Sequence, residues 1–227
     1  MAKILEVIVT SEDEAREAEA GGADRLELVR ALDAGGLTPD IHAIEQVLGA
    51  VRIPVRVMLR DEATLTSGGA RSIENLRRRA VELAQFPVDG LVLGFAENGS
   101  VDLDATARVL EGAPHCKVTF HKAFDEAVQP LNAIAQLKTL PQIDRILTSG
   151  GSGSWEERTR RLGCWQEAAA PEIRILVGAG LCELALSRLR DEPRLTEVHV
   201  GRAARAPSAV NGKVCRERVA ALKSALQ

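Results

Sequence analysis

Eight short runs rich in valine, isoleucine and leucine recur along the chain, and a longer amphipathic stretch follows each one. The runs are Lys3–Val9, Arg25–Val29, Pro54–Arg60, Gly90–Gly94, Cys116–His121, Arg145–Thr148, Ile173–Val177 and Glu197–Val200. Strands that alternate with helical segments are typical of βαβ units, which build a parallel sheet. Eight such units in 227 residues favour a closed (β/α)8 TIM barrel over an open sheet, with residues 1–227 as a single domain.

Helix signals in the intervening stretches agree with this pattern. The expected helices begin near Ser11, Asp40, Ser72, Asp102, Pro130, Ser154, Leu181 and Lys213. Ser11 precedes three acidic residues, which suit the positive end of a helix dipole. Proline at position 130 suits a first helical turn, where its missing N–H would have no helical partner.

The charge balance argues against nucleic-acid and membrane partners. The chain has 29 Lys and Arg against 32 Asp and Glu, for a net charge of −3, whereas a nucleic-acid-binding face is usually basic. No apolar run approaches the roughly 20 residues that a membrane span needs. The first residues also lack the small-residue cleavage site of a signal peptide. We therefore expect a cytoplasmic protein.

The cysteines support the same compartment. Cys116, Cys164, Cys182 and Cys215 fall in different predicted elements, and none forms a CxxC pair. A reduced cytosolic chain is the simplest interpretation, and the spacing does not predict a structural zinc site.

Ionisable residues interrupt the apolar strands, where burial is costly unless each charge has a partner. The candidates for catalysis are Glu6, Glu27, Arg60, His121 and His199. One interpretation is a polar pocket in which a carboxylate and a histidine act as general acid and base. The alternative is a buried salt-bridge network that fixes packing and register.

Small residues follow the last strands, where many barrels bind phosphate through backbone N–H groups. The residues that we expect to bind an anion are Thr148, Ser149, Gly178, Gly180, Gly201 and Arg202. Tight turns alone would also explain these residues. Asp125, just past the fifth strand, is expected either to pair with His121 or to cap the next helix.

Several motifs resemble those of the CutC family, which is described as a family of copper-homeostasis proteins with a TIM-barrel fold. The most specific motifs are Val118–Asp125 (VTFHKAFD) and Gly22–Leu28 (GADRLEL), supported by Arg145–Gly150 (RILTSG), Gly178–Gly180 and Glu197–His199. The resemblance covers almost the whole chain. It implies a role in copper homeostasis, copper as the bound cofactor, and a homodimer or larger homo-oligomer.

The chain departs from the family where copper would matter most. Family members often carry cysteines, proposed as copper ligands, at positions that are Ile8, Val9 and Val29 here. Because Cu(I) prefers thiolate and thioether ligands, these replacements argue against a Cu(I) site. His121 and His199, with Glu6 or Glu27 as third ligand, could instead bind Cu(II) or Zn(II) if they lie close together.

Two functions of different classes follow. The first is metal handling, as the resemblance implies. The second is an enzyme acting on a small, anionic, phosphorylated compound, in which Arg60 steadies an oxyanion and His121 or Glu27 moves a proton. A binding barrel without catalysis would use the same residues, since the fold alone does not fix the chemistry.

Overall fold

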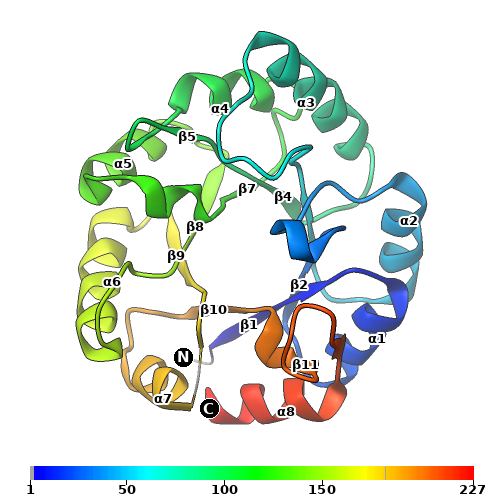
Figure 1. Ribbon diagram of the computed structural model, residues 1–227, viewed down its shortest axis with the longest axis vertical. Coiled ribbons are helices and arrows are strands. Elements are labelled where there is room, and N and C mark those ends of the chain that lie inside the picture. Colours follow the sequence, from blue (N-terminus) through cyan, green and yellow to red (C-terminus); the bar gives the residue numbers. More distant parts are fainter. Residues whose placement is uncertain (1–2, 182) are drawn as a thin grey trace.

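The computed structural model describes residues 3–181 and 183–227 and shows a closed ring of parallel strands (Figure 1). The barrel strands are β1 (Ile4–Val9), β2 (Arg25–Leu28), β3 (Val55–Met58), β4 (Gly90–Leu93), β7 (Val118–Phe120), β8 (Ile143–Thr148), β9 (Arg174–Val177) and β10 (Glu197–Val200). Every neighbouring pair is parallel, and β10 closes the ring against β1. The predicted (β/α)8 barrel is confirmed.

A ring of helices surrounds the strands, one after each barrel strand (Figure 1). They are α1 (Glu12–Ala20), α2 (Ile41–Ala50), α3 (Ala70–Leu83), α4 (Leu103–Leu110), α5 (Pro130–Leu137), α6 (Trp155–Ala169), α7 (Glu183–Asp191) and α8 (Arg216–Ala225). Apolar side chains of the strands and of the inner helix faces form one continuous core. Within the described ranges, no helix is both long and apolar enough to cross a membrane.

Side-chain caps explain why four of the eight helices begin where the sequence predicts. The residues that cap these helices by accepting a backbone N–H bond are Ser11, Asp40, Asp102 and Ser154. α7 begins at Glu183, two residues after the predicted start near Leu181. Two other predicted starts are also displaced. The first is near Ser72, because glycines with positive φ turn the chain into α3 two residues earlier. The second is near Lys213, because that residue pairs in a short hairpin and α8 begins after it.

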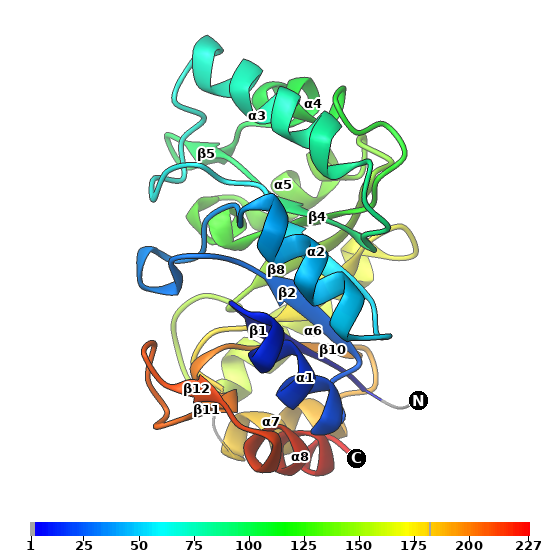
Figure 2. The same cartoon turned by 90° about the vertical axis from the view of Figure 1, so that its right-hand side faces the viewer.

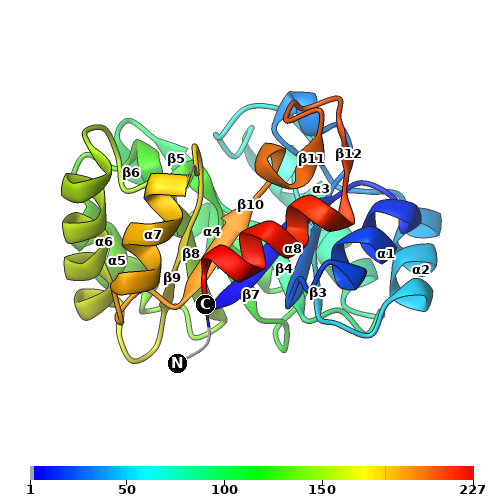
Figure 3. The same cartoon turned by 90° about the horizontal axis from the view of Figure 1, so that it is seen from below.

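Extra elements gather at the end of the barrel where the strands finish. They are η1 (Leu32–Ala34), the hairpin of β5 (Ala96–Glu97) and β6 (Ser100–Val101), η2 (Lys122–Glu126), η3 (Arg202–Ala204), and the hairpin of β11 (Arg205–Ala206) and β12 (Lys213–Val214). Figure 2 shows the hairpins on one side of the molecule and both chain ends on the other. In Figure 3 the β11–β12 hairpin stands above α8, on the side opposite the N-terminus.

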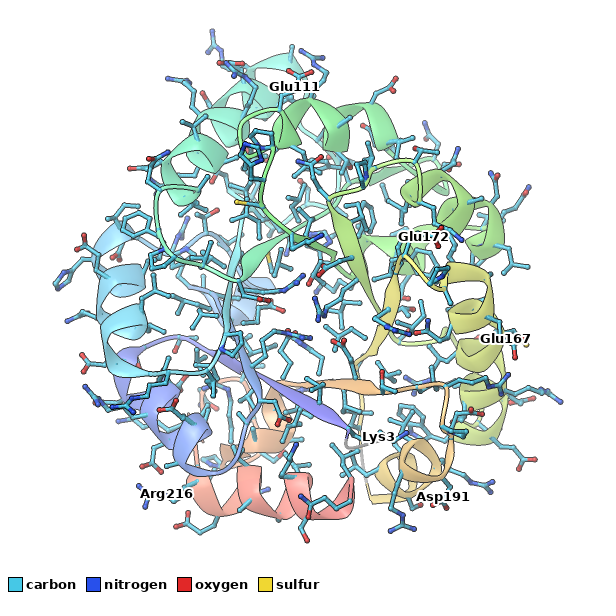
Figure 4. The ribbon with its side chains drawn as sticks, turned by 180° about the vertical axis from the view of Figure 1, so that it is seen from behind. Lys3, Glu111, Glu167, Glu172, Asp191 and Arg216 are labelled. Atoms are coloured by element: carbon cyan, nitrogen blue, oxygen red, sulfur yellow. The ribbon has the colours of Figure 1, made fainter. Side chains whose placement is uncertain are left out.

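The other end of the barrel is closed by charged side chains. The buried ammonium of Lys3 donates to the backbone carbonyls of Glu192 and Leu195, at 2.7 and 2.6 Å. Figure 4, seen from behind, places Lys3 inside the ring, whereas Glu111 and Arg216 lie on its outer edge. The entrance to the barrel is therefore at the opposite face, where the extra elements lie.

Candidate functional site

A network of ion pairs fills the inner end of the barrel lumen. Arg25 on β2 donates to Glu6 on β1 and, at 2.6 Å, to Glu197 on β10. Arg56 on β3 donates two hydrogen bonds of 2.7 Å to the carboxylate of Asp144 on β8. The network is completed by Asp89, Thr119 and Arg145. Each buried charge has a partner of opposite sign, as the structural interpretation of the strand residues predicts.

Three side chains from adjacent strands meet above this network. Nδ1 of His199 on β10 lies 2.7 Å from Oε1 of Glu6 and 3.5 Å from Oε2 of Glu27 on β2. They meet because β1 lies between β10 and β2 in the ring. Among the residues that the structure describes, no other three His, Cys, Asp or Glu side chains place their ligand atoms within 4.8 Å of one another.

The two carboxylates of this group have opposite pKa shifts. Burial alone would raise the pKa of Glu6, but the charge of Arg25 and the hydrogen bonds from His199 and Arg25 outweigh it and lower that pKa well below its usual range. Glu27 has no such cation against it, and its Oε2 is buried without a hydrogen-bond partner. Burial raises the pKa of Glu27 to about 7, although the nearby charge of His199 opposes the shift. Glu6 therefore stays ionised, whereas Glu27 exchanges its proton near neutral pH.

His199 lies beside both carboxylates. Burial favours its neutral ring, but the carboxylates of Glu27 and Glu6 outweigh burial and raise the pKa of His199. Its Nδ1 forms its hydrogen bond with Glu6, whereas Oε2 of Glu27 lies 3.5 Å from it without a hydrogen bond. An imidazole beside a carboxyl that exchanges its proton near neutral pH suits general acid and base catalysis.

His121 sits at the end of β7 in a different state. Its Nδ1 accepts a hydrogen bond of 3.2 Å from the backbone N–H of Ala123, which assigns the proton of the neutral ring to Nε2. Burial lowers the pKa of His121 to about 3, and the positive charge of Arg60 adds to the shift. His121 is therefore an uncharged N–H donor at neutral pH. It does not belong to the group of Glu6, Glu27 and His199, so the expected pair of histidine ligands is not formed.

Arg60 lies beyond the end of β3 and braces the loops around it. Its guanidinium donates to four backbone carbonyls, those of Gly35, Gly36, Ala63 and Thr64. These contacts join the loops that follow β2 and β3. Arg60 does not line the cavity at the mouth of the barrel. This position does not favour the role of stabilising an oxyanion that the sequence predicts for Arg60.

A cavity of about 510 Å³ opens at the mouth of the barrel. The predicted catalytic residues that line it are Glu27, His121 and His199, while Glu6 lies beneath them. All six predicted anion-binding residues also line it: Thr148, Ser149, Gly178, Gly180, Gly201 and Arg202. Apolar side chains cover part of its wall, including Ile8, Leu32 and Met58. The cavity thus combines polar groups on several strand ends with an apolar surface.

Asp125 and Lys122 occupy this mouth in ways that the sequence did not indicate. Asp125 neither pairs with His121 nor caps the next helix. Its carboxylate instead accepts a hydrogen bond from the Thr148 hydroxyl and one of 3.0 Å from the N–H of Ser149. Two of the expected anion donors are therefore already satisfied within the protein. Lys122 also lines the cavity. The sequence feature that could have identified it as a site residue is its position directly after His121 in the VTFHKAFD motif.

Arg158 on α6 ties together the loops that follow β8 and β9. Its guanidinium donates to the carbonyls of Ser149, at 2.7 Å, and Ala179, at 3.1 Å. It also stacks over the ring of Trp155, with its central carbon 3.6 Å from the centroid. This contact fixes the rim loop in which Ala179 and Gly180 both have positive φ.

The described cysteines do not supply a site for Cu(I). Cys116 precedes β7, Cys164 is exposed on α6, and Cys215 caps α8; all three are free thiols. Cys182 lies outside the described residues. A Cu(I) site needs several soft ligands close together, and these thiols lie on separate elements.

Comparison with known proteins finds relatives over most of the chain. The profile of the CutC family matches residues 3–204. A CutC family protein from Xanthomonas axonopodis pv. citri is 37% identical over 197 residues, covering 86% of this chain and 81% of that protein. The human copper homeostasis protein cutC homolog is 35% identical over 198 residues, covering 86% and 72%. The crystal structure of the CutC protein from Streptococcus agalactiae matches with a TM-score of 0.77 and 25% identity, covering 88% and 98%.

Proposed function

Because the chain belongs to the CutC family and carries a proton-exchanging carboxyl at its barrel mouth, we propose that it is an enzyme that moves a proton on a small anionic metabolite. The observation that carries the proposal is Glu27. A buried carboxyl with a free oxygen and a pKa of about 7, facing a cavity, is costly for stability and useful for catalysis. Such groups cluster at active sites because catalysis needs a pKa near the working pH.

The other residues have complementary roles in this proposal. Glu27 takes a proton from carbon or oxygen of the substrate, and the ring of His199 beside it stabilises the carboxylate before this transfer. Glu6, held ionised by Arg25, orients the His199 ring through Nδ1. His121 donates its Nε2–H to the substrate oxygen that gains negative charge, which is the role expected earlier for Arg60. The proposed reaction uses the cavity residues Glu27, His121 and His199, together with Glu6 and Arg25 beneath them.

Proton exchange with solvent tests this proposal directly. Phosphorylated hydroxycarbonyl compounds would be incubated with the protein in D2O, and deuterium incorporation at carbon followed by NMR. We expect Glu27→Gln to slow the exchange by about 100-fold or more, the usual contribution of a general base. Glu45→Gln, which removes an exposed carboxylate on α2, is the matched control. Equal exchange in wild type and Glu27→Gln would refute the role of Glu27.

Copper handling is the second candidate, and the group of Glu6, Glu27 and His199 favours it. Two carboxylate oxygens and an imidazole nitrogen suit Cu(II) or Zn(II) better than Cu(I). The free Oε2 of Glu27 is the natural first ligand. A metal ion at this place would have to displace the His199 ring from its hydrogen bond to Glu6. The role in copper homeostasis implied by family membership would then rest on a divalent ion.

Equilibrium dialysis with Cu(II) and Zn(II) tests this candidate. We expect any tight binding to be lost in His199→Ala and Glu27→Gln, and retained in Cys116→Ser. A Cu(I) titration of the reduced protein without oxygen is expected to show no tight site. Tight Cu(I) binding that disappears in the cysteine variant would reverse this assignment.

We further propose that the protein works in the cytoplasm as a homodimer or larger homo-oligomer. Its three described cysteines are free thiols, which suits a reducing compartment. Light scattering on the purified protein would measure the oligomeric state.

A further inference from the structure

Lys122 brings to the cavity a positive charge that is not held in an ion pair by any of the described residues. Its side chain makes no ion pair or hydrogen bond with another described residue. A Cβ placed on Gly35 would lie 3.0 Å from Nζ of Lys122 and 3.3 Å from a terminal nitrogen of Arg60. The two cations therefore lie close to the same point, and Arg60 has only backbone carbonyls as acceptors. Like charges this close repel each other, so an anion bound here would be stabilised by both.

Arg202 supplies a second unpaired cation on a distant part of the rim. It begins η3 after β10 and lines the cavity, and its guanidinium makes no ion pair within the described residues. In the strand order, β10 and β7 are separated by β9 and β8, so they lie almost opposite in a ring of eight. The loop containing Gly180 lies between the two cations along this arc.

The acidic groups of the cavity do not cancel these charges. Asp125 is engaged by Thr148 and Ser149, and no hydrogen bond or ion pair joins it to Lys122. Glu27 is deeper in the barrel, where its carboxyl lies beside His199. The mouth therefore presents two separate positive positions with Glu27 and His199 below them.

From this arrangement we infer that the ligand carries two anionic groups, one at each end, such as a phosphate and a carboxylate. Lys122 binds one group, and Arg202 with the Gly180 loop binds the other. The uncharged middle of the ligand then lies over Glu27 and His121. The inference rests on the proposed function and names its substrate class.

Isothermal titration with three probes tests the inference: 3-phosphoglycerate, glycerol 3-phosphate and glycerate. The first has two anionic ends, and each of the others has one. We expect 3-phosphoglycerate to bind at least about 10-fold more tightly than either probe with one anionic group, since a charge-assisted contact contributes about one to two orders of magnitude. Lys122→Met should remove most of that advantage of 3-phosphoglycerate, while affecting one of the other two probes little.

Lys117→Met is the matched control, because Lys117 is exposed just before the start of the same strand, β7, at the far end of the barrel. It changes the net charge by the same amount without touching the cavity. We expect it to bind all three probes like the wild type.

The outcomes separate the inference from the proposed function. If a probe with one anionic group binds as tightly as 3-phosphoglycerate and Lys122→Met changes nothing, the two-ended ligand is excluded while an anion-binding enzyme remains. If no probe binds the wild type and crystals soaked in iodide show no ion at Lys122 or Arg202, the two-ended ligand is excluded, and the deuterium-exchange experiment alone decides the proposed function. Iodide at both positions would support two anion subsites whatever the length of the natural ligand.

Discussion

Glu6 and Glu27 show how position alone gives two carboxylates different chemistry. Both are buried on neighbouring strands at the centre of the barrel. Arg25 lies against Glu6 and holds it ionised, whereas Glu27 faces the cavity and the imidazole of His199. One residue becomes a fixed charge and the other an exchangeable proton, because only one of them has a permanent cation as partner.

The raised pKa of Glu27 predicts a pH-dependent cost in stability. Between its ordinary value of 4.5 and about 7, the unfolded chain loses a proton that the folded protein keeps. Stability should therefore fall as pH rises through this range, by roughly 1–3 kcal/mol, and then level off. Glu27→Gln lacks this cost, so its stability relative to wild type should be greater near pH 8 than near pH 5. Urea unfolding at both pH values measures the difference; an equal difference at both would contradict the assignment.

The state of the His121 ring is a second prediction at this scale. With a pKa of about 3 and Nδ1 accepting the Ala123 N–H, the ring should stay neutral in mildly acidic buffer with its proton on Nε2. Nitrogen-15 NMR of the imidazole distinguishes the two tautomers and the imidazolium. His115, which is exposed, provides an internal reference signal in the same spectra. An imidazolium signal from His121 at pH 6 would contradict the structure.

At the scale of elements, all eight strands could be predicted, and so could the carboxyl ends of four of them, whereas the other four end earlier than expected. Strands buried on both faces produce continuous apolar runs, so all eight were visible in the sequence. In β2, β3, β4 and β7 the predicted run continues past the last strand residue, because first loop residues such as Val29 and Leu59 are also buried. Arg60 and His121 were thus expected at strand ends, whereas β3 stops at Met58 and β7 at Phe120.

Side-chain partners between loops were the part that the sequence could not supply. Asp125 contacts Thr148 and Ser149 from a neighbouring loop, 23 or 24 positions away, and no local spacing marks such a contact. The grouping of Glu6, Glu27 and His199 depends on which strands become neighbours when the ring closes. The alternation of side chains along each strand could predict that these three residues point into the lumen. It could not predict how far along the barrel axis they lie or which side chains they contact.

Arg60 joins two loop elements, which leads to a prediction about stability. Arg60→Ala removes the donor that binds four backbone carbonyls of the loops after β2 and β3. We expect it to lower the free energy of unfolding by about 2 kcal/mol or more, because buried acceptors lose their partners. Arg52→Ala, an exposed change, should cost less than about 0.5 kcal/mol in the same urea experiment. A loss of binding without a loss of stability would instead favour a direct contact with ligand.

On the scale of the whole molecule, the lumen has two layers with different roles. The inner layer is a network in which every charge has a partner, and the outer layer contains the unpaired oxygen of Glu27 and the cations of the mouth. Glu6 belongs to both layers, since it binds Arg25 below and His199 above. The structural interpretation of the strand charges fits the inner layer, whereas the proposed function uses the outer one.

Breaking the inner layer should destabilise the whole barrel. Arg25→Met leaves the carboxylates of Glu6 and Glu197 buried without their shared cation. We expect a loss of about 3–5 kcal/mol, as for other buried ion pairs that lose one member. Arg77→Met, which removes an exposed ion pair with Glu74, should cost less than about 1 kcal/mol. Similar losses for both variants in urea unfolding would show that the lumen network contributes little.

The closure of β10 against β1 also determines when the barrel can be completed during synthesis. His199 and Glu6 are 193 positions apart, so a ribosome must release almost the entire chain before the two can meet. Until then β1 has an open edge, a state that is prone to pair with other chains. A nascent or prematurely terminated copy therefore lacks the group of Glu6, Glu27 and His199, which forms only once synthesis has passed the last strand of the barrel.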